Sequence, residues 1–273
     1  MERIKSCDLD INITVRPIQS KNGSLIYQTN NHQVVKVFSE KTLKENSSLL
    51  EEKLSNPRNI KGVIMPRDLV YIHDNLIGYT MDKVEGKVSE EYEKSISPYS
   101  RVNLLRLAYK YLELEKIVKE AGDDVVFPEL LDKVFIDKAD GIKVIGYDSI
   151  QVGNSEPIRK TITPSSLDKY NNNGLYTKEL DIKSLTLYYV RTVLDLDLRA
   201  LEEKDDEQTL HYISRVLDTL CLPEQLKEKI RTLYEKDKKN EYLGKDVLEI
   251  AEKYKVDIDE NCIYPTNKRL VLK

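Results

Sequence analysis

The stretch from Val134 to Asp148 reads VFIDKADGIKVIGYD, and it decides the expected fold. Two short apolar runs, Val134–Asp137 and Ile142–Ile145, flank an Asp-Gly pair at positions 140 and 141. Alternating apolar residues around Asp-Gly are a strong local signal for a β-hairpin, because such turns need residues that tolerate positive φ. We therefore predict a compact hairpin at this point of the chain.

The chain before residue 86 has the pattern of a small sheet with one helix. The pair Asn30-Asn31 predicts a hairpin turn between two apolar runs, and Asp74-Asn75 predicts another. Apolar residues at helical spacing, followed by Asn56-Pro57, predict a helix that ends at residue 55. The predicted strands are Ile11–Ile18, Ser24–Thr29, Gln33–Phe38, Leu69–Ile72 and Leu76–Met81, and the predicted helix is Glu40–Ser55. Residues 1–85 are thus expected to form one small lobe.

Residues 86–273 are mainly helical in pattern, and we expect them to form a second, larger lobe. Leu104, Ala108 and Leu112 lie near one face of its first long helix. Residues 153–174 are rich in Asn, Ser and Pro, which predicts an irregular loop. The predicted helices are Arg101–Ala121, Tyr176–Leu196, Glu207–Leu220, Glu224–Tyr234 and Lys245–Tyr254.

Composition excludes several classes of protein. The 273 residues are 40% hydrophobic and 33% charged, which is typical of a folded globular chain rather than a disordered one. The net charge of -4, with both signs mixed along the chain, argues against a nucleic-acid partner. No apolar run reaches the roughly 18 residues of a membrane span, so we expect no membrane partner. Three scattered cysteines, Cys7, Cys221 and Cys262, indicate reduced thiols in a cytoplasmic protein.

The order of these elements resembles the protein-kinase-like fold over nearly the whole chain. That family has a five-stranded lobe with one helix after the third strand, a hinge, and a helical lobe that carries a small β-hairpin. The resemblance implies an α+β, bilobal fold. It rests on the ordered set of elements rather than on one motif.

In the small lobe, the resemblance implies a phosphate-binding region. Gly23 stands where the family has a glycine-rich loop, whose backbone N–H groups approach phosphates. Lys36 matches the lysine of the third strand, which contacts the α- and β-phosphates in the family. The family pairs this lysine with a helix glutamate. Glu45 fits that role best by its distance from Asn56-Pro57, with Glu51 and Glu52 as alternatives.

The resemblance also implies an adenine-facing hinge and a structural aspartate. Met81 matches the residue that borders the adenine pocket, and the backbone of Asp82 and Val84 would face an adenine edge. Further on, Asp181 begins a stretch similar to the start of the central helix of the large lobe. In the family that aspartate holds the backbone of the catalytic loop.

The groups that transfer phosphate in the family have no match here. Gly146 stands where the metal-binding aspartate of Asp-Phe-Gly is expected, and glycine has no ligand atom. The metal-binding asparagine position falls on Lys133, or on Asp132 if the register slips by one. The catalytic aspartate position falls on Pro128 or Phe127. Neither residue can accept a proton.

Three neighbouring carboxylates are the remaining candidates for an unusual catalytic or metal site: Glu129, Asp132 and Asp148. Asp148 lies two residues past Gly146, which displaces it by roughly 6.6 Å in an extended segment. Mg²⁺ needs oxygen ligands at about 2.0–2.1 Å, so this shift is too large without a different backbone path. We expect Asp148 to be a loop or capping residue and the chain to hold no metal.

The sequence therefore favours a catalytically inactive kinase-like domain, a pseudokinase, that acts as a binding or regulatory module for another protein. No cofactor is required, and ATP binding without Mg²⁺ is the form of nucleotide binding that Lys133 allows. One alternative is an atypical ATP-dependent phosphotransferase or nucleotidyl transferase with rearranged carboxylates. Another is an unrelated α+β interaction protein with the same order of elements.

Overall fold

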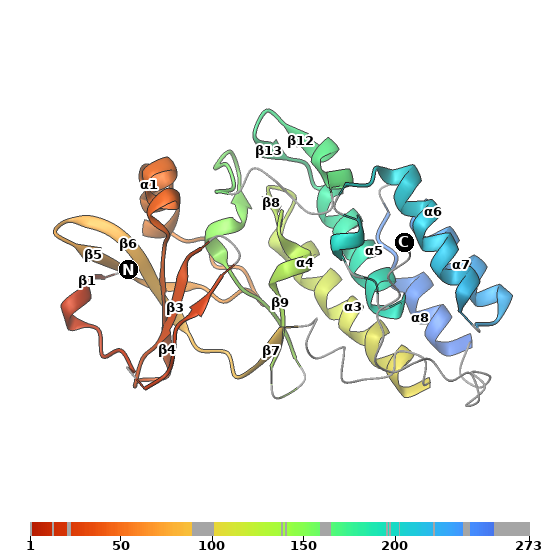
Figure 1. The fold of residues 1–273 in the computed structure, drawn as a ribbon, viewed down its shortest axis with the longest axis horizontal. Coiled ribbons are helices and arrows are strands. Elements are labelled where there is room, and N and C mark those ends of the chain that lie inside the picture. The colour runs from red at the N-terminus through yellow and green to blue at the C-terminus, as the bar shows by residue number, and fades with distance from the viewer. Residues whose placement is uncertain are drawn as a thin grey trace.

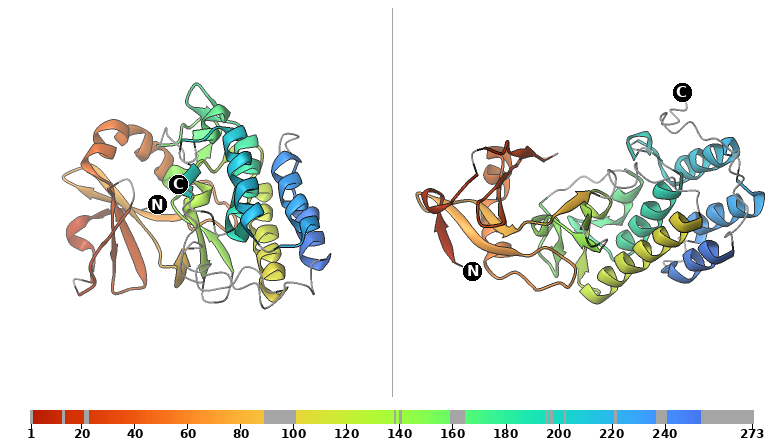
Figure 2. Two further views of the ribbon diagram at one scale, coloured as in Figure 1. Left: turned by 45° about the vertical axis from the view of Figure 1, so that its right-hand side comes forward. Right: turned by 90° about the horizontal axis from the view of Figure 1, so that it is seen from below.

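A mostly antiparallel sheet fills the N-terminal end of the molecule, and helices fill the C-terminal end (Figure 1). The computed structural model describes residues 2–12, 14–20, 23–88, 101–137, 139, 141–158, 165–194, 196, 198–201, 203–220, 222–236 and 241–253. The expected α+β class is confirmed. The views in Figure 2 also separate the strands of the first part from the helices of the second.

The first sheet has six described strands, one more than expected. They are β1 (Arg3–Lys5), β2 (Ile18–Gln19), β3 (Leu25–Gln28), β4 (Gln33–Val37), β5 (Pro66–Ile72) and β6 (Asn75–Asp82). Their order across the sheet is β1-β5-β6-β4-β3-β2, and only β1 runs parallel to its neighbour, β5. The helix α1 (Glu40–Ser55) follows β4, with the predicted bounds.

The strand predicted over Ile11–Ile18 is wrong. Ile11 makes one isolated bridge to Thr29, and β2 begins only at Ile18. Between them, the Asn12 side chain accepts a hydrogen bond from the backbone N–H of Thr14 at 3.0 Å. This Asx turn offers the backbone an alternative to a ladder, and it bends the chain before the strand can form.

Two small sheets lie between the first sheet and the helices (Figure 1). The predicted hairpin is present as β9 (Val134–Asp137) and β10 (Ile142–Val144), and β7 (Gly86–Val88) pairs with β9. The second small sheet joins β8 (Val125–Val126) to β11 (Gln151–Val152). The turn residue Asp140 lies outside the described residues.

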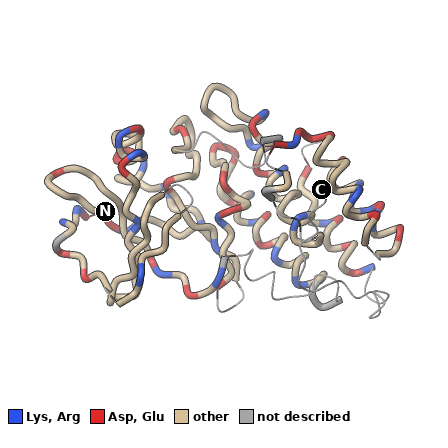
Figure 3. Tube along the Cα trace, in the orientation of Figure 1, with Lys and Arg blue, Asp and Glu red and all other residues tan. Residues whose placement is uncertain are grey.

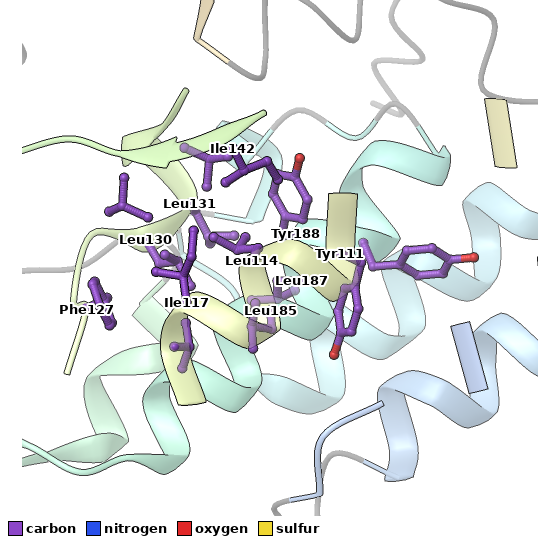
Figure 4. Packing of buried hydrophobic residues seen from close by; sticks show 14 of the residues in the cluster. Tyr111, Leu114, Ile117, Phe127, Leu130, Leu131, Ile142, Leu185, Leu187 and Tyr188 are labelled. Carbon is purple, nitrogen blue, oxygen red and sulfur yellow. The ribbon is translucent and has the colours of Figure 1, made fainter. Parts of the chain in front are cut away.

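The C-terminal helices pack around α5, whose residues Leu180–Leu194 are all buried. Tyr111 and Leu114 of α3 meet Leu185 and Tyr188 of α5 in this core (Figure 4). None of the described helices is long and apolar enough to cross a membrane. The helices are α3 (Arg101–Ala121), α4 (Leu130–Lys133), α5 (Glu179–Leu194), α6 (Asp206–Thr219), α7 (Glu224–Lys236) and α8 (Gly244–Lys253).

Part of the segment predicted to be an irregular loop, residues 153–174, is ordered. It contains the 3₁₀ helix η3 (Ser165–Tyr170) and the strand β12 (Asn171–Asn172), which pairs with β13 (Leu175–Tyr176). Asn173 and Gly174 both have positive φ, at 53° and 95°, and they make the tight turn between these strands. Residues 159–164 lie outside the described residues, as do Tyr254, Cys221 and Cys262.

Candidate functional site

The centre of the candidate site is an ion pair between the two parts of the chain. Lys36, in the middle of β4, donates to both carboxylate oxygens of Asp148, at 2.8 and 2.7 Å. Asp148 lies in the 3₁₀ helix η2 (Tyr147–Ser149), directly after the hairpin β9–β10. Lys36 is 4% exposed and Asp148 is 2% exposed. The pair is therefore shielded from water, so its charges interact more strongly than on a surface.

Tyr79 of β6 completes this arrangement. Its hydroxyl donates to Asp148 Oδ1 at 2.7 Å, and the side chain is fully buried. Burial alone would raise the pKa of Asp148. The charges of Lys36 and Lys133, with the hydrogen bonds from Lys36 and Tyr79, overcome that effect and hold the pKa of Asp148 at about 2. Asp148 is thus an anion whose oxygens are already engaged.

The expected pair between Lys36 and a glutamate of α1 is not formed among the described residues. Glu51 instead accepts hydrogen bonds from Tyr71 at 2.8 Å and from Arg3 at 3.3 Å, on the outer part of the sheet. Glu45 and Glu52 are exposed. The reason is the rotation of α1, which turns its glutamates away from β4.

The buried face of α1 carries a lysine at its centre instead. Its buried residues are Thr42, Leu50, Lys53 and Leu54. Lys53 is 6% exposed, and its Nζ has no hydrogen-bond partner in the part of the chain that the structure describes. Burial lowers the pKa of Lys53 to about 8, although the nearby charge of Asp148 raises it in part. Sequence reasoning missed this residue.

A third lysine, Lys133, lies beside Gly146. A Cβ atom placed on Gly146 would lie 3.3 Å from Cδ of Lys133 and 3.5 Å from its Nζ. Lys133 Nζ also lies 3.3 Å from a carboxylate oxygen of Glu129. Burial lowers the pKa of Lys133, but the charges of Glu129 and Asp148 outweigh burial and raise it. Lys133 is therefore a cation beside Gly146.

The carboxylates that were candidates for an unusual site have separate surroundings. Asp148 binds Lys36 and Tyr79, and Glu129 faces Lys133. Asp132 lies on the short helix α4 and is half-buried. Among the described residues, no group of three or more His, Cys, Asp or Glu side chains could hold a metal ion. Asp148, which was expected to be a loop or capping residue, lies in the short segment η2 between β10 and β11, and its carboxylate is the buried partner of Lys36.

A small pocket adjoins Lys133. Its cavity volume is about 10 Å³, which is room for about one water molecule. Glu129 and Lys133 are its charged residues, and Ser149 is also polar. The lining residues are Phe127, Glu129, Leu130, Lys133, Val144, Ile145, Ser149 and Ile150.

The remaining predicted binding residues lie at two places on the first sheet, the tip of the β2–β3 hairpin and the end of β6. Gly23 lies at the tip of the β2–β3 hairpin, where a Cβ atom would be 3.6 Å from Cβ of Ser39, the N-cap residue of α1. Met81 is buried near the end of β6, and the exposed Asp82 next to it binds Arg67. Val84 follows β6 and is half-buried.

Asp181 makes the backbone contact that the resemblance implied. Its carboxylate accepts the backbone N–H of Phe127 at 2.7 Å and lies 3.0 Å from Lys178 Nζ. Burial raises the pKa of Asp181 to about 6, against the lowering effects of Lys178 and the Phe127 hydrogen bond. This contact fixes the segment before α4, and therefore the position of Glu129 and Lys133.

No protein-family model matches the sequence, and no curated protein matches it. The interpretation of the site therefore rests on its own geometry.

Proposed function

We propose that the chain is a kinase-like domain that does not transfer phosphate and that acts as a binding or regulatory module. One observation carries the proposal: both oxygens of Asp148 are engaged by Lys36, and one of them also by Tyr79, inside the protein. The lysine that the resemblance assigns to nucleotide phosphates is thereby neutralised by a carboxylate of the same chain. Lys133 beside Gly146 adds a positive charge where a divalent ion would be needed.

Several contacts support the kinase-like part of this proposal. Helix α1 follows the strand that carries Lys36, and the lysine reaches the segment after the hairpin β9–β10. Asp181, near the start of the buried helix α5, holds the backbone of Phe127. These contacts agree with the family's arrangement, although the Lys36–glutamate pair does not.

The alternative of a phosphotransferase with rearranged carboxylates has less support from the geometry. Glu129 and Asp148 each face a lysine, and a carboxylate that is already paired with an ammonium group is a weak metal ligand. For the binding role we propose another protein as the partner, in the cytoplasm. Among the residues that the structure describes, Lys, Arg, Asp and Glu are interspersed along both parts, without the basic stripe of a nucleic-acid-binding protein (Figure 3).

Transfer of radiolabelled phosphate from ATP tests the proposal. We expect no incorporation into the protein itself or into generic protein acceptors, with Mg²⁺ or Mn²⁺ present. Incorporation that disappears in both Lys36→Ala and Asp148→Ala would overturn it in favour of the phosphotransferase. Lys44→Met is the matched control, because Lys44 is an exposed lysine that pairs with Glu40.

A further inference from the structure

The turn of the β12–β13 hairpin is an Asn-Gly pair. The pairing of Asn172 with Leu175 leaves Asn173 and Gly174 as the two turn residues, and both have positive φ. Asn-Gly is a preferred pair for such a turn, because both central residues need positive φ. Asn173 is exposed and Gly174 is half-buried. The fold therefore fixes this pair at the surface, where water reaches Asn173.

An exposed Asn-Gly pair is also chemically labile. The backbone nitrogen of Gly174 can attack Cγ of the Asn173 side chain, because glycine has no Cβ atom that would obstruct the approach. The new N–Cγ bond closes a cyclic imide. The Gly174 nitrogen gives its proton to water, and the amide group of Asn173 takes a proton from water and leaves as ammonia. Water then opens the imide to aspartate or isoaspartate, so the sum of the two steps is hydrolysis of one amide.

One hydrogen bond holds the attacking nitrogen in the folded chain. The backbone N–H of Gly174 donates to Oδ1 of Asn171 at 2.8 Å. This bond must break before the nitrogen can lose its proton and turn towards Asn173. Asn171 is itself held in place, because β12 pairs it with the buried Tyr176 and its side chain forms a hydrogen bond with the Tyr176 hydroxyl.

We propose that Asn173 is a site of spontaneous deamidation and that Asn171 controls the rate of the reaction in the folded chain. The inference does not depend on the proposed function. The product adds a negative charge to the turn beside Glu156, since a Cβ atom on Gly174 would lie 2.9 Å from a carboxylate oxygen of Glu156. Like charges at close range repel, so deamidation weakens the contact of the hairpin with the segment that carries Glu156.

A second Asn-Gly pair, Asn22-Gly23, serves as an internal reference. The backbone N–H of Gly23 donates to the backbone oxygen of Ser20 at 2.9 Å, so a substitution at Asn171 leaves that bond intact. Asn22 itself lies outside the described residues. A change that affects the whole protein alters the rates at both pairs, whereas a change in the hairpin alters only the rate at Asn173.

Incubation of the whole chain at mildly alkaline pH, followed by digestion and mass spectrometry, measures both rates from the mass difference between acid and amide. We expect Asn171→Ala to raise the rate at Asn173 by about 2- to 10-fold, as for the loss of one hydrogen bond, and to leave the rate at Asn22 unchanged. Asn171→Asp keeps an oxygen acceptor for Gly174 and should stay near the wild-type rate. So should the matched control Asn172→Ala, at the exposed neighbouring position.

Two outcomes with the variants overturn the proposal. One is an unchanged rate at Asn173 in Asn171→Ala. The other is an equal increase at Asn22 and Asn173, which would report a general effect on the protein.

The wild-type protein gives a test that requires no variant to fold. In guanidinium chloride the bond between Gly174 and Asn171 is lost, so we expect the rate at Asn173 to rise on unfolding. Equal rates in the folded and unfolded protein overturn the proposal. So does the absence of any product at Asn173 in the unfolded chain.

Discussion

Lys36 and Asp148 are 112 positions apart in the sequence, and they form a buried ion pair at 2.7 Å that joins the first sheet to the segment after the hairpin β9–β10. Removing one member of such a pair leaves an uncompensated charge, which is far more costly than removing both. We therefore predict that the effects of substituting Lys36 and Asp148 on the free energy of unfolding are strongly coupled.

Lys36→Met is expected to lower the free energy of unfolding by about 3–5 kcal/mol, because Asp148 would remain buried without its cation. The double variant Lys36→Met with Asp148→Leu should be markedly more stable than the sum of the two single effects predicts. Urea denaturation measures all four proteins. The control Lys44→Met should stay within about 0.5 kcal/mol of the wild type. A cost below about 1 kcal/mol for Lys36→Met would contradict the buried pair.

Tyr79→Phe removes only the hydroxyl that donates to Asp148. We expect a loss of about 1.5–3 kcal/mol, the usual range for a hydrogen bond to a charged group. Tyr189→Phe is a matched control, since Tyr189 is also buried but its hydroxyl has no hydrogen-bond partner among the described residues. Removal of the Tyr189 hydroxyl should leave the free energy of unfolding unchanged or raise it. Equal effects of the two substitutions in urea denaturation would show that the Tyr79 hydroxyl contributes nothing.

Lys53 should make the free energy of unfolding depend on pH, with a sign opposite to that of a lysine paired with a carboxylate. Its folded-state pKa of about 8 lies below the ordinary value of 10.5, so the unfolded chain binds more protons between these two values. Stability should therefore rise with pH from about 8 to 10.5. Burial of the charged Lys53 side chain lowers the free energy of unfolding by about 3 kcal/mol below pH 8.

The Lys53→Met variant isolates this contribution. In phosphate-free buffer it should be more stable than the wild type at pH 7, and the difference should shrink as pH rises through 8 towards 10.5. Urea denaturation across this pH range gives the comparison. A difference that is constant with pH would mean that Lys53 is not buried as a cation.

Gly78→Ala tests how closely β6 must approach β4. A Cβ atom at Gly78 would lie 2.0 Å from the backbone oxygen of Lys36, so the two strands would have to separate. We expect a loss of about 2–3 kcal/mol in urea denaturation, as for overpacked cores. Gly153→Ala is the control, because its Cβ would meet nothing within 4 Å. The control still carries the cost of a positive φ of 57°, so a larger loss there than at Gly78 would argue against the close approach.

Elements with a local signal could be predicted from the sequence. The bounds of α1 and α3 agree with their predictions, because both helices have apolar residues at helical spacing and Asn56-Pro57 directly follows α1. The hairpin β9–β10 has its Asp-Gly turn in the sequence. Strand β1 has only three residues, and its parallel partner β5 is more than 60 positions away. No local sequence pattern predicts such a pairing.

The candidate site was predictable only in part, because its contacts also join residues that are far apart in the sequence. Lys36 and Gly146 could be found from the order of elements, but the partner of Lys36 depends on how α1 is rotated. The spacing of Thr42, Leu50, Lys53 and Leu54 was a usable signal, since these four residues share one helical face. A lysine on an apolar helix face is most often a surface residue, so the spacing alone does not place Lys53 in the interior.

Strand β1 also determines which strand of the first sheet is open to solvent. With β1 in place, Leu69–Tyr71 of β5 are paired on both sides, and a three-residue strand ends the sheet. Short strands at a sheet border are poor templates for other chains. Detachment of the first five residues would uncover the N–H and C=O groups of β5, a long strand that contains Val70 and Tyr71. Self-association through β5 would then compete with folding, so the first few residues protect the solubility of a chain whose core they barely touch.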